Sequence, residues 1–300
     1  RTSMKIRMKD KVFFGDCRDT LQQIAKSDSK SRMCVTSPPY YGLRNYGGED
    51  TQIGLEQSPE EFIDELVKVF RGVRDCLTDD GTLWVNIGDS YYNYRPGKGQ
   101  SYPKQSVSKT NQDLPQECSK RGNKLEGLKE KDLIGIPWML AFALRKDGWY
   151  LRQDIIWSKP NPMPESVRDR CTKSHEYIFL FSKSQKYYFD VDAIKEPTVD
   201  NKGMKRKKSV WNVRTKPYKG AHFAVYPDEL ITPTILAGSK EGDIILDPFM
   251  GSGTTAAVAK SLDRYYLGCE LHSEYDELIK KRVNEVTDNK TSRSPLDQLM

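Results

Sequence analysis

The sequence predicts an α/β fold in which helices cover both faces of a seven-stranded, mostly parallel β-sheet. Short apolar runs alternate along the chain with segments of helical periodicity, a pattern typical of consecutive βα units. A glycine-rich turn near residue 250 joins one such run to a helical pattern, as in Rossmann-type ligand sites. The 300 residues, 37% hydrophobic and 30% charged, are enough to bury one large core.

The seven expected strands are short apolar runs bounded by polar or helical segments. The first two precede the first long helical pattern, and the last two flank the glycine-rich turn and the helix after it. The seven runs occupy residues 11–16, 33–37, 82–88, 150–157, 176–182, 243–248 and 265–270.

The clearest helix start is at residues 58–61, Ser-Pro-Glu-Glu. Serine suits the N-cap, proline the first helical position, and glutamate the third position of a capping box. A core-facing stripe follows at helical spacing. Its residues are Phe62, Leu66, Val69 and Val73. Further helices are expected over residues 136–148, 228–237, 252–261 and 273–285.

Two polar segments interrupt this alternation. Residues 93–132 are rich in Gly, Pro, Ser and Lys and are expected to form a long, flexible insertion. Residues 196–221 contain four consecutive basic residues and are expected to be a loop that faces solvent or carries specificity. The expected organisation is one domain over residues 4–286, followed by a tail at 287–300.

The bulk properties narrow the class of protein. A net charge of +6 and a pI near 8.8 favour a polyanionic partner if the charges gather on one face. The six cysteines lie far apart without a C-x-x-C pair, so the sequence indicates no disulfide framework and no metal site, and fits a reducing compartment. No run has the length of a membrane span and no signal peptide is evident, so we expect a soluble, intracellular protein.

Residues 242–275 form the most informative segment. It is expected to run strand, glycine-rich turn, helix and strand, and to end at the acidic Glu270. Gly251 and Gly253 permit close backbone approach to a ligand, and Glu270 is placed to accept hydrogen bonds from two ribose hydroxyls. The alternative, a tight structural turn, explains the glycines but not the acidic residue.

The residues around this turn indicate which ligand it binds. The pattern is neither G-x-G-x-x-G nor a Walker loop, so a pyrophosphate is disfavoured. Asp247 and Phe249 at the strand tip suit a ligand with a cationic amino-acid portion and an adenosine portion, and Thr254 opens the next helix. The sequence therefore predicts an S-adenosylmethionine site.

With these residues the chain resembles the amino-group DNA methyltransferases of the circularly permuted beta group. The resemblance covers most of residues 11–286, with the catalytic motif before the cofactor motif. Its segments are 14–21, 36–40, 83–92, 154–164, 175–181, 222–231 and 247–255. It implies a Rossmann-like methyltransferase fold with circularly permuted motif order.

The resemblance also implies roles for single residues. Asp16 would contact the adenine of the cofactor and Glu270 its ribose. The methionine end would lie against Asp247, Phe249 and Gly251, and Phe223 would close that side. Gly253 and Thr254 are further candidates for cofactor binding.

The catalytic motif is Thr-Ser-Pro-Pro-Tyr at residues 36–40. The prolines stiffen the backbone and leave its carbonyls free as acceptors. Ser37 Oγ would accept one hydrogen of an exocyclic amine and the carbonyl of Pro38 the other, Pro39 would hold the loop rigid, and Tyr40 would stack on an extruded base. No cysteine follows a proline and Ser37 lies in no G-x-S-x-G elbow, so covalent carbon-5 methylation and hydrolysis are disfavoured.

The amine that is methylated depends on residue 37. In this family Ser-Pro-Pro-Tyr usually accompanies cytosine N4, so we expect a site-specific cytosine-N4 DNA methyltransferase that uses S-adenosylmethionine. Since a serine can accept from either amine, an adenine-N6 methyltransferase on the same scaffold stays open. RNA methylation and a non-catalytic DNA-binding module are further alternatives.

Double-stranded DNA is the expected partner, and the segment around residues 202–219 is the candidate target-recognition region. Its basic residues would mostly contact phosphates. The candidates are Lys205, Arg206, Lys207, Lys208, Trp211 and Arg214. A cognate restriction endonuclease or a fused reader domain would complete the system. The expected location is the cytoplasm, associated with the nucleoid, if the source is bacterial or phage, and the nucleus if it is eukaryotic.

Overall fold

A computed structural model describes residues 8–42, 52–92, 124–216 and 226–291. Within them, the main sheet has eight strands in the order β1-β10-β9-β2-β3-β5-β4-β8. Only β5 runs against the others, so the sheet is mostly parallel. The strands are β1 (Lys11–Phe14), β2 (Ser31–Thr36), β3 (Leu77–Ile87), β4 (Tyr150–Ser158), β5 (His175–Ser182), β8 (Val210–Asn212), β9 (Ile244–Asp247) and β10 (Tyr265–Glu270).

All seven predicted strands are present, but the expected number of strands was wrong. The eighth, β8, lies inside the segment that was expected to be a loop, and it pairs in parallel with the edge strand β4. Its three residues are too short a run, in too basic a context, to produce a period-2 pattern. The tertiary contact decides its conformation, because Trp211 is buried against Trp157, its register partner on β4.

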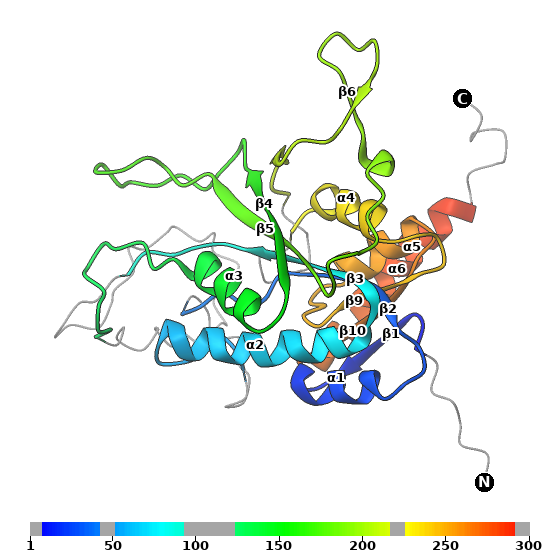
Figure 1. Ribbon diagram of the computed structural model, residues 1–300, viewed down its shortest axis with the longest axis horizontal. Helices are drawn as coiled ribbons and strands as arrows, with labels where there is room; N and C mark the ends of the chain where they lie inside the picture. Colours follow the sequence, from blue (N-terminus) through cyan, green and yellow to red (C-terminus); the bar gives the residue numbers. More distant parts are fainter. Residues whose placement is uncertain (1–7, 43–51, 93–123, 217–225, 292–300) are drawn as a thin grey trace, which may run out of the picture.

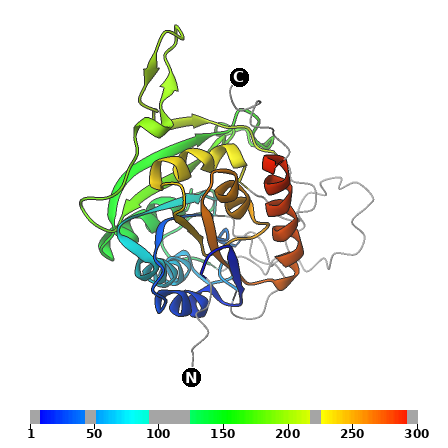
Figure 2. The ribbon, with the colours of Figure 1, turned by 90° about the vertical axis from the view of Figure 1, so that its right-hand side faces the viewer.

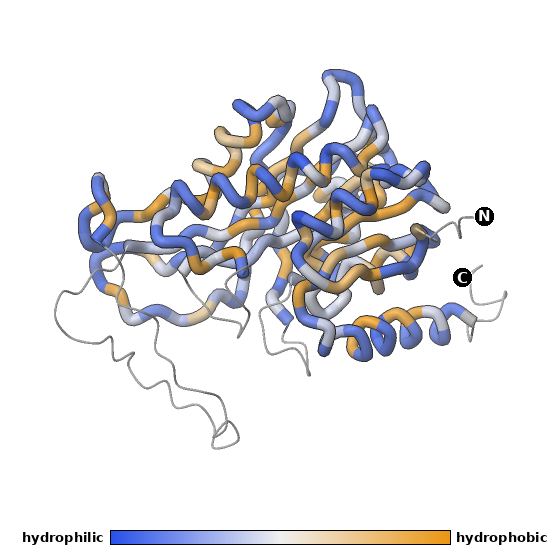
Figure 3. Tube along the Cα trace, turned by 90° about the horizontal axis from the view of Figure 1, so that it is seen from below, coloured by the Kyte–Doolittle hydropathy of each residue, from blue (hydrophilic) through white to orange (hydrophobic). Residues whose placement is uncertain are grey.

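Helices cover both faces of the sheet, as predicted (Figures 1 and 2). Three pack on one face and three on the other, and each group joins its own hydrophobic cluster. The first group is α1 (Cys17–Ala25), α2 (Pro59–Cys76) and α3 (Ile136–Lys146), and the second is α4 (Asp228–Gly238), α5 (Thr254–Ser261) and α6 (Asp276–Thr291). In Figure 3 the strands carry long hydrophobic stretches, whereas α6 alternates between hydrophobic and hydrophilic residues.

The helix boundaries show which local signals are decisive. Ser58 caps α2 by accepting a hydrogen bond from the Glu61 N–H at 3.2 Å, and the predicted stripe on this helix is fully buried. The sequence analysis missed α1, and it ended the last helix at 285, whereas α6 continues to Thr291. Asp89, just after β3, caps α3 from a distant segment by accepting from the Gly135 N–H at 3.0 Å.

The segment after β5 projects from the body of the protein. A short 3₁₀ helix, η1 (Asp192–Ile194), leads into a hairpin of β6 (Glu196–Pro197) and β7 (Met204–Lys205), which stands away from the main sheet (Figures 1 and 2). A second 3₁₀ turn, η2 (Ser273–Tyr275), precedes α6. Among the described residues, no helix is both long and apolar enough to cross a membrane.

Candidate active site

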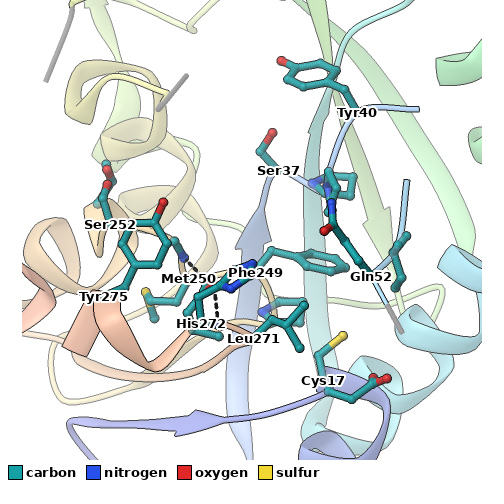
Figure 4. A pocket seen from close by; sticks show the side chains of 18 of the residues that line it. Cys17, Ser37, Tyr40, Gln52, Phe249, Met250, Ser252, Leu271, His272 and Tyr275 are labelled. Atoms are coloured by element: carbon teal, nitrogen blue, oxygen red, sulfur yellow. Dashed lines mark hydrogen bonds between the residues drawn. The ribbon is translucent and has the colours of Figure 1, made fainter. Parts of the chain in front are cut away.

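One pocket at the carboxyl ends of the parallel strands contains most of the predicted catalytic and cofactor-binding residues. β1, β2, β9 and β10 run parallel and end at one edge of the sheet, where open α/β folds bind ligands. The predicted residues that line the pocket are Asp16, Ser37, Pro38, Pro39, Tyr40, Phe249, Gly251, Thr254 and Glu270. In Figure 4, Ser37 and Tyr40 lie above Phe249, and Leu271 and His272 lie below it.

Two predicted cofactor residues, Asp247 and Gly253, do not line this pocket, and Phe223 lies outside the described residues. Sequence reasoning also missed several lining residues. Some lie within the segments of the family resemblance, and the others come from the loop before α2 or from the chain after β10. They are Gly15, Cys17, Gln52, Ile53, Tyr226, Pro248, Met250, Ser252, Leu271, His272 and Tyr275. Ser252 and Met250 lie within the predicted glycine-rich motif and could have been found there.

Asp247 joins the predicted catalytic loop to the glycine-rich turn. Its strand, β9, is the neighbour of β2, so the tips of both strands meet. Thr36 Oγ1, one residue before Ser37, donates to Asp247 Oδ1 at 2.6 Å. The Phe249 N–H donates to the same oxygen at 2.9 Å. One carboxylate therefore ties together the two loops that form opposite sides of the pocket.

The second oxygen of Asp247 is also occupied by protein donors. Thr255 Oγ1 donates to Oδ2 at 2.6 Å and the Tyr226 hydroxyl at 3.3 Å, and these two hydroxyls also contact each other. Burial raises the pKa of Asp247, although all of these hydrogen bonds oppose that shift. Asp247 is 1% exposed and its hydrogen bonds join the two loops. Its contact with the cofactor stays a prediction.

The glycine-rich turn needs glycine at two positions for conformational reasons. Gly251 and Gly253 have φ values of 54° and 89°, which L-residues with side chains rarely adopt. A Cβ on Gly253 would lie 3.1 Å from the Cα of Ile279 in α6. Gly251 lines the pocket, whereas Gly253 lets the start of α5 pack closely on α6.

Glu270 is held rigidly at the end of β10. Its Oε2 accepts the Gly251 N–H at 2.7 Å and its Oε1 accepts the His272 N–H at 3.1 Å. Burial raises the pKa of Glu270, and the two backbone hydrogen bonds oppose this shift. Because a carboxylate offers about four acceptor positions, Glu270 retains two for a pair of ligand hydroxyls.

Asp16 occupies the N-cap of α1 and lines the pocket between β1 and the helix. It accepts hydrogen bonds from the Arg18 N–H at 2.9 Å and from Arg18 Nη2 at 2.5 Å. Partial burial opposes ionisation, but the hydrogen bonds and charge of Arg18 lower the pKa of Asp16. Asp16 is therefore an ionised acceptor at the wall of the pocket.

The predicted DNA-binding residues extend from Lys205, at the end of β7, to Arg214, just after β8, and none of them lines the pocket. Arg206, Lys208 and Arg214 are exposed. Trp211 is only 5% exposed, and its indole N–H donates to the Lys208 carbonyl at 2.7 Å. Its ring therefore packs in the core. The sequence analysis, by contrast, predicted that Trp211 contacts DNA.

A second basic segment, which the sequence analysis did not single out, lies at the same edge of the sheet as the pocket. The connection between β4 and β5 covers residues 159–174 and emerges where β2 and β3 also end. Its cations are Lys159, Arg168, Arg170 and Lys173. The Arg170 guanidinium packs 3.9 Å from the centre of the Tyr91 ring, which fixes this connection against the chain after β3.

A comparison with protein families identifies the class to which this geometry belongs. The family described as DNA methylase, which groups N6 and N4 enzymes, matches residues 31–281. The chain belongs to this family. The matched region includes the Ser37–Tyr40 loop, the glycine-rich turn and Glu270, so the family's shared core contains most of the pocket described above.

Curated relatives are similar over almost the whole chain. The type II methyltransferase M.SmaI of Serratia marcescens is 52% identical over 91% of this chain and 90% of its own length. The type II methyltransferase M.Cfr9I of Citrobacter freundii is 50% identical over 91% of this chain and 87% of its own. The chain is thus a DNA methyltransferase whose similar curated relatives are type II enzymes.

Solved structures share the fold. The PvuII DNA methyltransferase, described as cytosine-N4-specific, aligns with a TM-score of 0.64 at 17% identity and covers 93% of this chain and 90% of its own. A protein of Thermus thermophilus, solved in complex with S-adenosyl-L-methionine, aligns with a TM-score of 0.58 at 25% identity, covering 91% and 92% of the two chains.

Proposed function

We propose that this DNA methyltransferase transfers a methyl group from S-adenosylmethionine to the N4 amine of cytosine in double-stranded DNA. The observation that carries the proposal is the shared pocket: the Ser-Pro-Pro-Tyr loop and the glycine-rich turn line one cavity. The N4 assignment depends on Ser37, because serine before Pro-Pro-Tyr usually accompanies cytosine N4. The adenine-N6 amine is the alternative target on the same scaffold.

The pocket residues fit S-adenosylmethionine. Glu270 has acceptor positions left for the two ribose hydroxyls. Asp16 is a carboxylate at the wall of the pocket with a lowered pKa, and we place the adenine against it. Phe249 and Gly251, proposed for the methionine end, line the pocket, and so does Thr254. When bound, the cofactor supplies a methyl group on a sulfonium centre.

The chain's own residues prepare the amine for attack. The exocyclic amine of cytosine is a poor nucleophile because its lone pair is delocalised into the ring. Ser37 Oγ and the Pro38 carbonyl accept the two amine hydrogens, which favours a more tetrahedral nitrogen with its lone pair available. The target nucleotide leaves the duplex at a cost of about a few kcal/mol, and Tyr40 stacks on the extruded base.

Strand order supports the proposal that the motifs are circularly permuted. β9, which carries the glycine-rich turn, is late in the sequence but central in the sheet, and it lies between β10 and the early strand β2. The catalytic loop thus precedes the cofactor turn in sequence while the two are adjacent in space. The type II relatives support a cognate restriction endonuclease as a further proposed partner.

The deciding experiment identifies the product. The protein is incubated with S-adenosylmethionine and unmodified duplex DNA of varied sequence, and the digested nucleosides are resolved by mass spectrometry. N4-methylcytosine is the expected product. N6-methyladenine would overturn the target base and keep the mechanism, and methylation of RNA alone, or no product, would overturn the proposal.

A variant tests the acceptor loop. Ser37→Ala should keep cofactor affinity, measured by calorimetry, and lower kcat by about tenfold or more, because one positioned acceptor is lost. Ser184→Ala is the matched control, since Ser184 follows β5 at the opposite edge of the sheet, where its hydroxyl donates to the Asp79 carbonyl. Turnover of Ser37→Ala equal to that of the control would refute the acceptor role of Ser37.

A further inference from the structure

A second polar cluster lies at the same edge of the sheet, and of its residues only Tyr40 also lines the pocket. Its centre is Glu176 on β5, 9% exposed. Its partners come from three other segments: Tyr40 after β2, Asn86 on β3 and Lys159 after β4. The cluster therefore gathers the ends of four strands around one buried carboxylate.

All of these partners donate hydrogen bonds to Glu176. Oε1 accepts from the Tyr40 hydroxyl at 3.0 Å and from Lys159 Nζ at 2.6 Å. Oε2 accepts from Asn86 Nδ2 at 3.0 Å. The orientation of the Asn86 amide is set by a second bond, from Nδ2 to the Tyr177 carbonyl at 3.1 Å.

Lys159 is itself fixed in place. Its backbone N–H donates to the Ser174 carbonyl at 2.8 Å, and its ammonium lies 4.4 Å from the centre of the Trp157 ring. A buried carboxylate is costly unless a cation and hydrogen bonds compensate it. Lys159 supplies that cation 2.6 Å from Glu176 Oε1, the same oxygen that accepts the Tyr40 hydroxyl.

The ring of Tyr40 is also restrained at its edge. A Cβ on Gly88 would lie 3.2 Å from Tyr40 Cε1 and 3.2 Å from Glu176 Cδ. The ring thus packs directly on the backbone of Gly88, with its hydroxyl bonded to a charged acceptor. Bonds to ionised acceptors are about twice as strong as neutral ones, so the ring is held in one orientation before any ligand arrives.

We propose that Glu176, neutralised by Lys159, is a positioning residue that orients the Tyr40 ring to receive the extruded target base. This inference rests on the proposed function, because it assumes that Tyr40 stacks on that base. Glu176 does not line the pocket and acts through Tyr40. A ring fixed in advance loses little conformational freedom when the base stacks on it, which lowers the cost of forming the reactive complex.

The variant Glu176→Gln tests the proposal with a minimal change in shape. The three partners all donate, so a glutamine NH₂ must face a donor on one side of the residue. If the NH₂ faces Tyr40 and Lys159, the hydroxyl loses its acceptor. If it faces Asn86, the carbonyl that remains is a neutral and weaker acceptor, and Lys159 loses its counter-charge.

The experiment is a double-mutant cycle in kcat for methylation of the DNA that the wild-type protein modifies. Tyr40→Phe and Glu176→Gln should each lower kcat by about tenfold, and the double variant should be no slower than the slower single variant. Calorimetry should give wild-type affinity for S-adenosylmethionine in all three. The control is Asp10→Asn, which should keep wild-type kcat. Asp10 lies just before β1, at the opposite edge of the sheet, and its carboxylate forms an ion pair with Lys260.

The outcomes separate the two proposals. A wild-type protein that methylates no DNA overturns the proposed function. An active wild type in which Glu176→Gln keeps full kcat, or in which the two substitutions are additive, overturns the positioning role alone. Loss of cofactor affinity together with kcat in Glu176→Gln would also overturn it, since that result indicates a general structural role.

Discussion

Replacing Thr255 by valine should weaken the connection between the cofactor turn and the catalytic loop. The substitution keeps the shape of the side chain and removes the hydroxyl that donates to Asp247 Oδ2 at 2.6 Å. Thr255 is fully buried, so no water replaces the lost donor. Hydrogen bonds to charged groups contribute about 1.5–3 kcal/mol, so the free energy of unfolding at pH 7 should fall by about 2 kcal/mol.

The loss of stability in Thr255→Val should depend on pH. Burial raises the folded-state pKa of Asp247, so its carboxyl binds a proton at a higher pH in the folded than in the unfolded chain. Stability that comes from the protonated form is present below the unfolded pKa and is lost as pH rises through the folded pKa. A neutral carboxyl gains less from the Thr255 hydrogen bond than a charged carboxylate does. The difference in free energy of unfolding between Thr255→Val and wild type should therefore shrink as pH falls.

Urea unfolding at several pH values, within the range where the wild type stays folded, measures this difference. Thr232→Val is the matched control, because the Thr232 hydroxyl donates to the Asp228 carbonyl on the exposed side of α4. The control should change stability by less than about 0.5 kcal/mol. A loss in Thr255→Val that is equally small, or that is constant across pH, would refute the assignment of Asp247 as a buried carboxylate that needs its donors.

Two further predictions concern the glycine-rich turn and β10. Gly253→Ala should lower the free energy of unfolding by about 1–3 kcal/mol more than Gly242→Ala, because both glycines have positive φ but only Gly253 packs against α6. Thermal or urea unfolding measures this difference, and equal losses would contradict the close packing. Glu270→Gln should weaken S-adenosylmethionine binding by about tenfold or more in calorimetry, because the new NH₂ group would face a backbone N–H donor. The control is Glu274→Gln, at an exposed position, which should bind the cofactor with wild-type affinity. Equal affinities of the two variants would remove Glu270 from the site.

The local patterns of the sequence determined the elements that carry the site. All seven expected strands exist, because apolar runs and turn residues act over a few positions. The capping residues at 58–61 fixed the start of α2 for the same reason. The Ser37–Tyr40 loop and the glycine-rich turn were each recognisable from their own residues, and both line the pocket.

Other features depended on segments that are far apart in the sequence. β8 forms because Trp211 finds a partner on β4, so neither the strand nor the burial of this ring could be predicted from a short basic segment. The start of α3 at residue 136 was predicted from the local pattern, but its cap, Asp89, comes from a separate segment.

The tertiary structure alone decided what the buried carboxylates do. Asp247 meets Thr36 across 211 positions and Glu176 meets Tyr40 across 136, because strand order brings their tips together. Periodicity and turn chemistry act between near neighbours, whereas hydrogen bonds between strand ends depend on which strands are adjacent in the sheet. The sequence therefore determined which residues form the two sides of the pocket, and the order of the strands determined how those sides are held together.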